Sequence, residues 1–324
     1  MSNDVERGFA LLDLGRQDEA IAIIRKSAER GDADALMTLA QWYLIGQPLP
    51  RDLKEARRFL HRAVREGNAD AALMEVALTA NGAGSRADWR AGLELLEAAA
   101  ARYGGVAAQH LALLLRMNID EEGNPREAIE PEKLGREFHV HRWRQFLTAE
   151  ECAHIAMAAQ DLLEPSIVAD PRTGRAIPHP IRTSSAAVIG PSRETLPIQA
   201  ILRRIAAVTG TKVEQGEPLN LLHYAPGQEY REHMDVLPME QNQRVVTAII
   251  YLNSGYVGGE TRFTQQGLSI AGSGGDMIAF SNSLPDGSPD IRSRHLGTVV
   301  HQGAKWAATR WIRRTEFDVW KQNR

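Results

Sequence analysis

The hydrophobic pattern of the chain changes near residue 118. Up to about residue 117, Ala, Leu and Arg predominate, and apolar residues recur at the spacing of amphipathic helices. Residues 35–44 (ALMTLAQWYL) lead through Gly46 to Asp52 and then to a second apolar stretch, residues 54–60 (KEARRFL). This order predicts a helix, a turn and a second helix, which ends at Gly67.

The helical pattern repeats along the chain. Residues 28–35 (AERGDADA) return as residues 64–71 (VREGNADA) and, more loosely, as residues 101–108 (ARYGGVAA). The glycines of these copies, Gly31, Gly67 and Gly104, lie 36 and 37 residues apart. A period in this range is typical of stacked helix pairs. The third copy departs from the pattern, because residues 81–86 (NGAGSR) offer no clear counterpart to Asp52.

These repeats resemble the tetratricopeptide-like repeats of the Sel type over roughly residues 5–117. The resemblance depends on glycine, alanine and aromatic positions that recur in register. It implies a concave surface that binds a protein. An alternative is a helical cap that only shields or solubilises the rest of the chain. We therefore expect a helical-pair repeat domain over residues 1–117.

A second pattern follows a polar, acidic segment that contains two prolines, and we expect that segment, residues 118–137, to be a linker. In the second domain, residues 138–324, the capping-box sequence TAEE at 148–151 predicts a helix to about residue 163. Another helix is expected over 194–209. Short apolar runs separated by turns then predict the strands of a β-sandwich or barrel, at 219–224, 245–252, 261–263, 277–280 and 297–300.

Composition narrows the possible functions. The length of 324 residues favours two domains, and the net charge of −3 argues against nucleic acid as a partner. No apolar run approaches the roughly 20 residues that span a bilayer, and the first residues lack a signal-peptide pattern, so we expect no membrane partner and a cytoplasmic protein. Cys152 is the only cysteine, which excludes an intrachain disulfide and a thiolate metal cage. We expect this thiol to be buried in a helix.

The segment YREHMD at 230–235 contains the candidate chemistry. On a β-strand, residues two apart point to the same face, so His233 and Asp235 could bind one ion together. A third ligand could come from His295 or His301, which lie far downstream. Two histidines and a carboxylate form the facial triad of non-haem Fe(II) oxygenases, which leaves open positions on the metal. The His-x-Asp pattern alone is a weak signal, since chance supplies it in many chains.

The neighbouring motifs strengthen the signal. After HYAPGQEYREHMD at 223–235 come RVVTAIIYLN at 244–253, GGETRF at 258–263, GDMIAF at 275–280 and HLGTVVHQGAKWAATRW at 295–311. This succession resembles the catalytic domain of the prolyl 4-hydroxylases, which are 2-oxoglutarate- and Fe(II)-dependent dioxygenases. The resemblance covers nearly all of residues 138–317, in order. It implies a double-stranded β-helix (jelly-roll) with flanking helices, and hence an α+β multidomain chain with the helical repeats first.

The resemblance also implies a metal site of His233, Asp235 and His295. In the family, the distal histidine precedes the oxoglutarate-binding lysine by ten residues, as His295 precedes Lys305. We expect His301, only four residues before Lys305, to be a turn or surface residue.

Four further residues receive roles from the resemblance. Lys305 is expected to bind the far carboxylate of 2-oxoglutarate, with the hydroxyl groups of Tyr224 and Thr261 as donors. Arg244 and Trp311 are expected at the substrate cleft. Ordinary strand packing is the alternative for Tyr224 and Thr261, a core position for Trp311, and a salt bridge on a strand for Arg244.

The implied activity is the hydroxylation of a C–H bond, with Fe(II), 2-oxoglutarate and O₂ consumed together, ascorbate as reductant, and succinate and CO₂ as products. The implied substrate is a prolyl residue of a protein or peptide, which the repeats could capture. Many relatives have an aromatic residue after the metal-binding aspartate, where this chain has Val236 and Leu237. A non-prolyl or small-molecule substrate is therefore an alternative, and so is a catalytically silent scaffold that works through its repeats.

Overall fold

The computed structural model describes residues 1–127, 129–135, 138–169, 176–178 and 181–321. It divides into two compact units. The repeat unit comprises Met1–Gly123 with Pro191–Gln199, and the sheet unit comprises Asn124–Gly190 with Ala200–Arg324. None of the helices in these described ranges combines the length and apolar character that a bilayer crossing requires.

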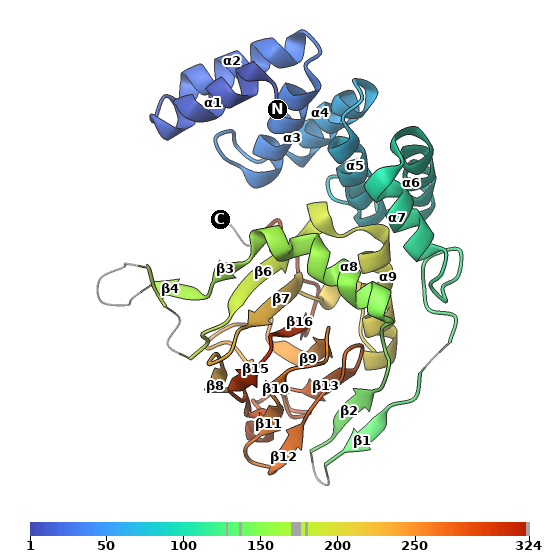
Figure 1. Ribbon diagram of the computed structural model, residues 1–324, viewed down its shortest axis with the longest axis vertical. Coiled ribbons are helices and arrows are strands. Elements are labelled where there is room, and N and C mark those ends of the chain that lie inside the picture. Colours follow the sequence, from blue (N-terminus) through green and yellow to red (C-terminus); the bar gives the residue numbers. More distant parts are fainter. Residues whose placement is uncertain (128, 136–137, 170–175, 179–180, 322–324) are drawn as a thin grey trace. The chain divides into compact units, whose positions relative to one another are not determined.

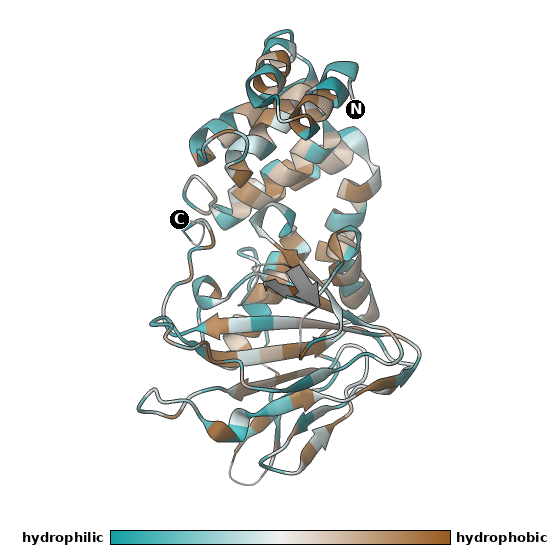
Figure 2. Cartoon of the chain, turned by 90° about the vertical axis from the view of Figure 1, so that its left-hand side faces the viewer, coloured by the Kyte–Doolittle hydropathy of each residue, from teal (hydrophilic) through white to brown (hydrophobic). Residues whose placement is uncertain are grey.

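The repeat unit is a series of antiparallel helix pairs, in which α3 packs on α4 and α5 packs on α6 (Figure 1). Hydrophilic and hydrophobic residues both occur along these helices (Figure 2). On α4 the buried residues Ala56, Phe59, Leu60 and Ala63 have the three- and four-residue spacing of one helix face, whereas α3 is buried over most of residues 35–44. Residues 191–199 join this unit through the side chain of Gln199, whose Nε2 donates to the Ala77 carbonyl at 3.1 Å. The helices are α1 (Asn3–Asp13), α2 (Gln17–Glu29), α3 (Ala33–Ile45), α4 (Leu53–Arg65), α5 (Ala69–Asn81), α6 (Trp89–Tyr103) and α7 (Gly105–Leu114).

The glycine that recurs in the repeats follows the end of one helix, and the residue after it is the N-cap of the next helix. Gly31 and Gly67 have φ of 84° and 92°, which a residue with a side chain adopts only at a cost. The carboxylate of Asp32 then accepts hydrogen bonds from the first turn of α3, and Asn68 caps α5 in the same way. The predicted helix pairs and the end of the second helix at Gly67 are confirmed.

The repeat that follows Gly67 and contains residues 81–86 does have a counterpart to Asp52, and the expectation that it lacks one was wrong. Asp88 caps α6 with φ and ψ of −143° and 97°, close to the −146° and 100° of Asp52 at the start of α4. Both aspartates stand 21 residues after their repeat glycines, Gly31 and Gly67. The segment 81–86 ends two residues before this cap, which is why it showed no match.

The sheet unit contains two antiparallel sheets that face each other, as expected for a jelly-roll. The order of the larger sheet is β1-β2-β13-β9-β16-β7-β6-β3, and that of the smaller is β12-β11-β14-β8 (Figure 1). The larger sheet comprises β1 (Glu132–Leu134), β2 (Val140–Trp143), β13 (Met277–Ser281), β9 (Arg244–Tyr251), β16 (Lys305–Arg313), β7 (Leu219–Tyr224), β6 (Ser185–Ile189) and β3 (Glu164–Pro165). The remaining strands are β12 (Leu268–Ile270), β11 (Thr261–Phe263), β14 (His295–Gly297), β8 (Tyr230–His233) and the pairs β10 (Val257–Gly258) with β15 (Val300–Gln302) and β4 (Ile167–Ala169) with β5 (Ala176–Pro178).

Aromatic and aliphatic side chains from both sheets fill the space between them. The rings of Phe263 on β11 and Phe280 on β13 meet edge to face at 4.9 Å. The other members of this buried cluster are Phe138, Val140, Tyr251, Ile270 and Ile278. The cluster fixes the separation of the two sheets, and the ring of His295 on β14 packs against Phe263 and Phe280.

Two helices accompany the sheets. α8 (Ala149–Ala159) contacts β6 and β7, and Thr148 starts it with the predicted capping box. A short 3₁₀ turn follows at Gln160–Leu162. α9 covers Leu196–Thr209, as expected. Cys152 on α8 is 2% exposed, and burial raises the pKa of its thiol to about 11.

The structure corrects three details of the strand predictions. The expected strand at 297–300 is two strands, because β14 ends at Gly297 in the smaller sheet and β15 begins at Val300 beside β10. The expected linker, 118–137, includes β1, which pairs with β2. Asp235 lies two residues beyond the end of β8, so strand geometry alone does not place it beside His233.

Candidate functional site

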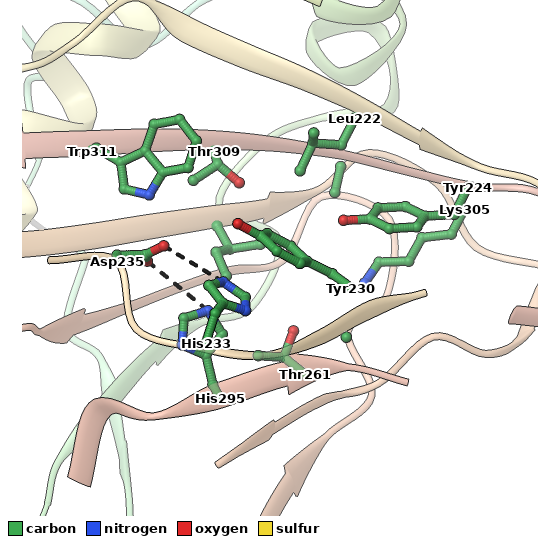
Figure 3. A pocket seen from close by; sticks show the side chains of 13 residues that line it. Leu222, Tyr224, Tyr230, His233, Asp235, Thr261, His295, Lys305, Thr309 and Trp311 are labelled. Carbon is green, nitrogen blue, oxygen red and sulfur yellow. Dashed lines mark ion pairs between the residues drawn. The ribbon is translucent and has the colours of Figure 1, made fainter. Parts of the chain in front are cut away.

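Two histidines meet across a pair of strands. His233 on β8 is the direct partner of His295 on β14, and their rings lie 4.3 Å apart. The chain bends after β8 and brings Asp235 to the same point. Asp235 Oδ1 lies 3.6 Å from His233 Nε2, and Asp235 Oδ2 lies 3.9 Å from His295 Nε2. One ligand atom from each of the three residues lies within 4.8 Å of the others, and the ion pairs are drawn in Figure 3.

Backbone carbonyls set the tautomer of both histidines. His233 Nδ1 lies 2.8 Å from the Arg231 carbonyl, and His295 Nδ1 lies 2.9 Å from the Ser293 carbonyl. A carbonyl only accepts, so each Nδ1 carries a hydrogen, and each Nε2 is the ring nitrogen on the side of Asp235. His233 Nε2 is buried and has no hydrogen-bond partner among the described residues. Burial lowers the pKa of His295 to about 4, so this imidazole is neutral near pH 7.

The third member of the cluster is an ionised carboxylate. Asp235 is 4% exposed, and the hydroxyl of Thr247 on β9 donates to its Oδ2 at 2.6 Å. Burial opposes ionisation, but the facing imidazoles and this hydroxyl outweigh it and hold the pKa of Asp235 below its ordinary value. Two neutral imidazole nitrogens and one carboxylate oxygen are the donor set of the facial triad, so these residues fit a non-haem Fe(II) ion.

A buried ammonium lies at the other end of the same pocket (Figure 3). Lys305 on β16 is the cross-strand partner of Tyr224 on β7, and it is 5% exposed. Its Nζ donates to the Gly259 carbonyl at 2.6 Å and lies 5.4 and 5.2 Å from the ring centres of Tyr224 and Tyr251. Burial lowers the pKa of Lys305 to about 8. The negative charge of Glu260 offsets part of this effect, and an anionic ligand in the pocket would pair with the ammonium directly.

Thr261 lies in this pocket with a partner that the sequence analysis missed. The hydroxyl of Tyr251 on β9 donates to Thr261 Oγ1 at 2.8 Å. The hydrogen of Thr261 is then available for an acceptor in the pocket. The sequence pattern could have identified Tyr251, because it follows Thr247 and Ile249 at the two-residue spacing of side chains on one strand face. The adjacent chain accommodates the Tyr251 ring, since a Cβ at Gly272 would lie 2.1 Å from it.

The pocket is small and mostly closed. Its cavity of about 40 Å³ has room for only a few water molecules. The Tyr230 ring stacks on His233 with centres 3.6 Å apart and lies between the cluster and Lys305 (Figure 3). A larger ligand therefore requires this ring to move. The lining residues are Leu222, Tyr224, Tyr230, His233, Asp235, Ile249, Thr261, His295, Gly297, Lys305, Ala307, Thr309 and Trp311.

Comparison with known proteins identifies the family. The sequence pattern of the 2OG-Fe(II) oxygenase superfamily matches residues 219–313, which contain the whole cluster and Lys305. The chain is 32% identical over 242 residues to a probable prolyl 4-hydroxylase 10 of Arabidopsis thaliana, covering 67% of this chain and 83% of that protein. It is 34% identical over 224 residues to prolyl 4-hydroxylase 5 of the same plant, covering 62% and 76%. The chain belongs to the prolyl 4-hydroxylase family of 2OG-Fe(II) oxygenases.

The solved structures that are similar to part of this prolyl 4-hydroxylase homologue include a repeat protein. It is a Sel1 repeat protein from Oxalobacter formigenes, with 26% sequence identity, coverage of 34% of this chain and 85% of that one, and a TM-score of 0.31.

Arg244 and Trp311, both expected at the substrate cleft, differ in their relation to this pocket. Trp311 lines the pocket, and its Nε1 is buried without a hydrogen-bond partner in the described part of the chain. Arg244 does not line it. The guanidinium of Arg244 stacks 3.9 Å from the Trp311 ring centre and binds Glu217 through contacts of 2.5 and 2.8 Å. Glu217, which the sequence analysis did not single out, also binds Arg313 at 2.6 Å.

The two neighbouring histidines lie outside the pocket. His301 is exposed on β15, in agreement with the prediction of a surface position. His223 on β7 packs against Trp306, with ring centres 4.5 Å apart. Of the four histidines in these motifs, only His233 and His295 reach Asp235.

Proposed function

We propose that this chain is a 2-oxoglutarate- and Fe(II)-dependent dioxygenase that hydroxylates a prolyl residue of a protein or peptide and releases succinate and CO₂. The observation that carries the proposal is one partly enclosed pocket with a His–Asp–His cluster at one end and a buried lysine at the other. One end fits a metal ion, and the other fits a carboxylate. 2-Oxoglutarate has the two functional ends that such a pocket would join.

The residues at the two ends of the pocket have different roles. His233, Asp235 and His295 would hold Fe(II), which supplies the activation of O₂ coupled to the decarboxylation of 2-oxoglutarate. Lys305 and Thr261 bind the far carboxylate by charge and by hydrogen bonding. The small cavity admits only a few water molecules, and this limited hydration strengthens both interactions.

A prolyl substrate is supported by the names of the relatives, which are prolyl 4-hydroxylases. We further propose that the helical repeats capture the protein substrate and that ascorbate keeps the iron reduced. Substrate capture would give the long repeat unit a function in the same reaction. Chemical cross-linking of the full chain to a hydroxylated partner, followed by mapping of the cross-linked residues, tests this. Cross-links confined to the sheet unit would count against capture by the repeats.

The direct test of function is succinate release by the full chain with Fe(II), ascorbate, O₂ and 2-oxoglutarate. Proline-containing peptides should stimulate release and gain about 16 Da, the mass of one oxygen. The same peptides with alanine in place of proline should not. His295→Ala should abolish both signals, whereas His301→Ala, at an exposed position away from the pocket, should retain them.

Two results would favour the alternatives. Hydroxylation of alanine-substituted peptides or of a small molecule would reject proline as the target. Absence of turnover with every protein fraction, together with intact capture of a partner, would favour a silent scaffold.

A further inference from the structure

Two buried residues behind the cluster form a chain of hydrogen bonds that ends on Asp235. Thr247 Oγ1 on β9 donates to Asp235 Oδ2 at 2.6 Å. Asn282, directly after β13, donates from Nδ2 to Thr247 Oγ1 at 2.8 Å. Thr247 and Asn282 are both 0% exposed. No solvent therefore competes for these bonds.

The direction of these bonds follows from the donor chemistry. The Asn282 amide nitrogen has only hydrogens to offer, so Thr247 must accept from it. The single hydrogen of the Thr247 hydroxyl is then committed to the carboxylate. One oxygen of Asp235 is thereby fixed by the protein, and the other keeps its lone pairs for a metal ion. Neither Thr247 nor Asn282 lines the pocket or contacts a reacting atom.

Asn282 also connects to the second histidine through the backbone. Its carbonyl accepts from the Asp290 amide at 3.0 Å, and the Asp290 carbonyl accepts from the Ser293 amide at 2.9 Å. The Ser293 carbonyl then receives the Nδ1 hydrogen of His295 at 2.9 Å. The loop from Asn282 to His295 is thus tied at its start to the support of Asp235 and at its end to the orientation of His295.

The side chain of Asn282 lowers the stability of the folded protein. Asn282 Oδ1 is buried and has no hydrogen-bond partner among the described residues. An unsatisfied buried polar atom costs about 1–3 kcal/mol, and an apolar residue of similar size would avoid it. Among the residues that the structure describes, the Asn282 side chain makes one hydrogen bond, to the Thr247 hydroxyl behind the cluster.

We propose that Thr247 and Asn282 are positioning residues of the metal centre, which hold Asp235 in its ligating orientation and fix which of its oxygens faces the ion. The inference rests on the proposed function, because it requires a metal at the cluster. Partners of this kind commonly change metal affinity by about 10- to 100-fold when removed.

The test measures binding of Co(II) to the full chain by titration of its visible absorption bands, which report ligand geometry. Thr247→Val keeps the shape but removes the donor, and it should weaken Co(II) binding about 10- to 100-fold and shift the bands. Thr247→Ser restores the hydroxyl and should bind within about threefold of the native chain. Asn282→Asp changes the shape little but reverses the polarity, since a carboxylate would take the Thr247 hydrogen. It should lose affinity as Thr247→Val does.

The matched control is Thr209→Val, which removes a hydroxyl that donates to the Ile205 carbonyl at 2.7 Å, in a helix away from the cluster. It should bind Co(II) as the native chain does. If Thr247→Val does not fold, as judged by thermal unfolding, the contrast between Thr247→Ser and Asn282→Asp decides.

The results distinguish failure of the proposed metal site from failure of the proposed positioning role. A native chain that does not bind Co(II) would refute the metal site and with it the proposed function. Native-like affinity and spectrum in both Thr247→Val and Asn282→Asp, with strong binding by the native chain, would overturn the positioning role alone.

Discussion

Replacement of Lys305 with methionine should lower the affinity for 2-oxoglutarate and raise the stability of the ligand-free protein. Lys305 is 5% exposed, and among the described residues its ammonium donates one hydrogen bond, to the Gly259 carbonyl. Without it, the far carboxylate of the co-substrate would be buried with no opposite charge. Removal of one partner from such a pair costs about 2–5 kcal/mol. At 1.4 kcal/mol per tenfold, affinity should fall by a factor of about 30 to several thousand.

Stability of the ligand-free protein should rise in the same variant. Burial lowers the pKa of Lys305 from 10.5 to about 8, which corresponds to about 3 kcal/mol against the protonated form in the folded state. Because the folded pKa is the lower one, this cost is fully present below pH 8 and declines as the pH rises towards 10.5. Methionine avoids it but loses a hydrogen bond worth about 1 kcal/mol. We expect a net gain of about 2 kcal/mol at pH 7.

The assay is calorimetric titration of 2-oxoglutarate into the Co(II)-loaded chain, together with denaturant unfolding of the metal-free chain. The native Kd should be constant below about pH 7 and rise about tenfold per pH unit above pH 8, as Lys305 loses its proton. Lys305→Arg is the matched variant, since a guanidinium stays charged and should abolish this pH dependence. Co(II) affinity should not change, because Lys305 is not in the cluster. Unchanged Kd and lower stability in Lys305→Met would refute the reasoning.

One further prediction concerns a hydrogen bond in the same pocket, and another concerns a buried ion pair of the repeat unit. Tyr251→Phe removes the hydrogen bond to Thr261 and should weaken 2-oxoglutarate binding about fivefold, by roughly 1 kcal/mol, with unchanged Co(II) affinity; equal weakening of both would assign Tyr251 a merely structural role. In the repeat unit, Arg57→Met leaves the buried carboxylate of Glu75 without its partner at 3.2 Å and should destabilise the chain by about 3 kcal/mol. Burial raises the pKa of Glu75, so the loss should be larger at pH 8 than at pH 5 in thermal unfolding, and a loss independent of pH would contradict this assignment.

Local sequence patterns predicted much of the fold because they act over a few residues. A glycine with positive φ followed by Asp32 or Asn68 ends one helix and starts the next, and both residues are adjacent in the chain. The strands at 219–224 and 261–263 were predicted to the residue. The prediction of the helix start failed at Asp88, because this capping residue lies just outside the compared segment 81–86. The prediction of one strand at 297–300 failed because this apolar run contributes to two different sheets.

The sequence by itself also determined which residues could form the site: His233, Asp235, His295 and Lys305 are recognisable from their types, spacing and neighbouring motifs. Only the tertiary structure decided what holds them. Thr247, Tyr251 and Asn282 act through hydrogen bonds to residues 10 to 35 positions away in the chain. Such pairs form only when the register of β9 against β13 and the closing of the two sheets bring them within 3 Å, and neither is encoded in a short stretch of sequence.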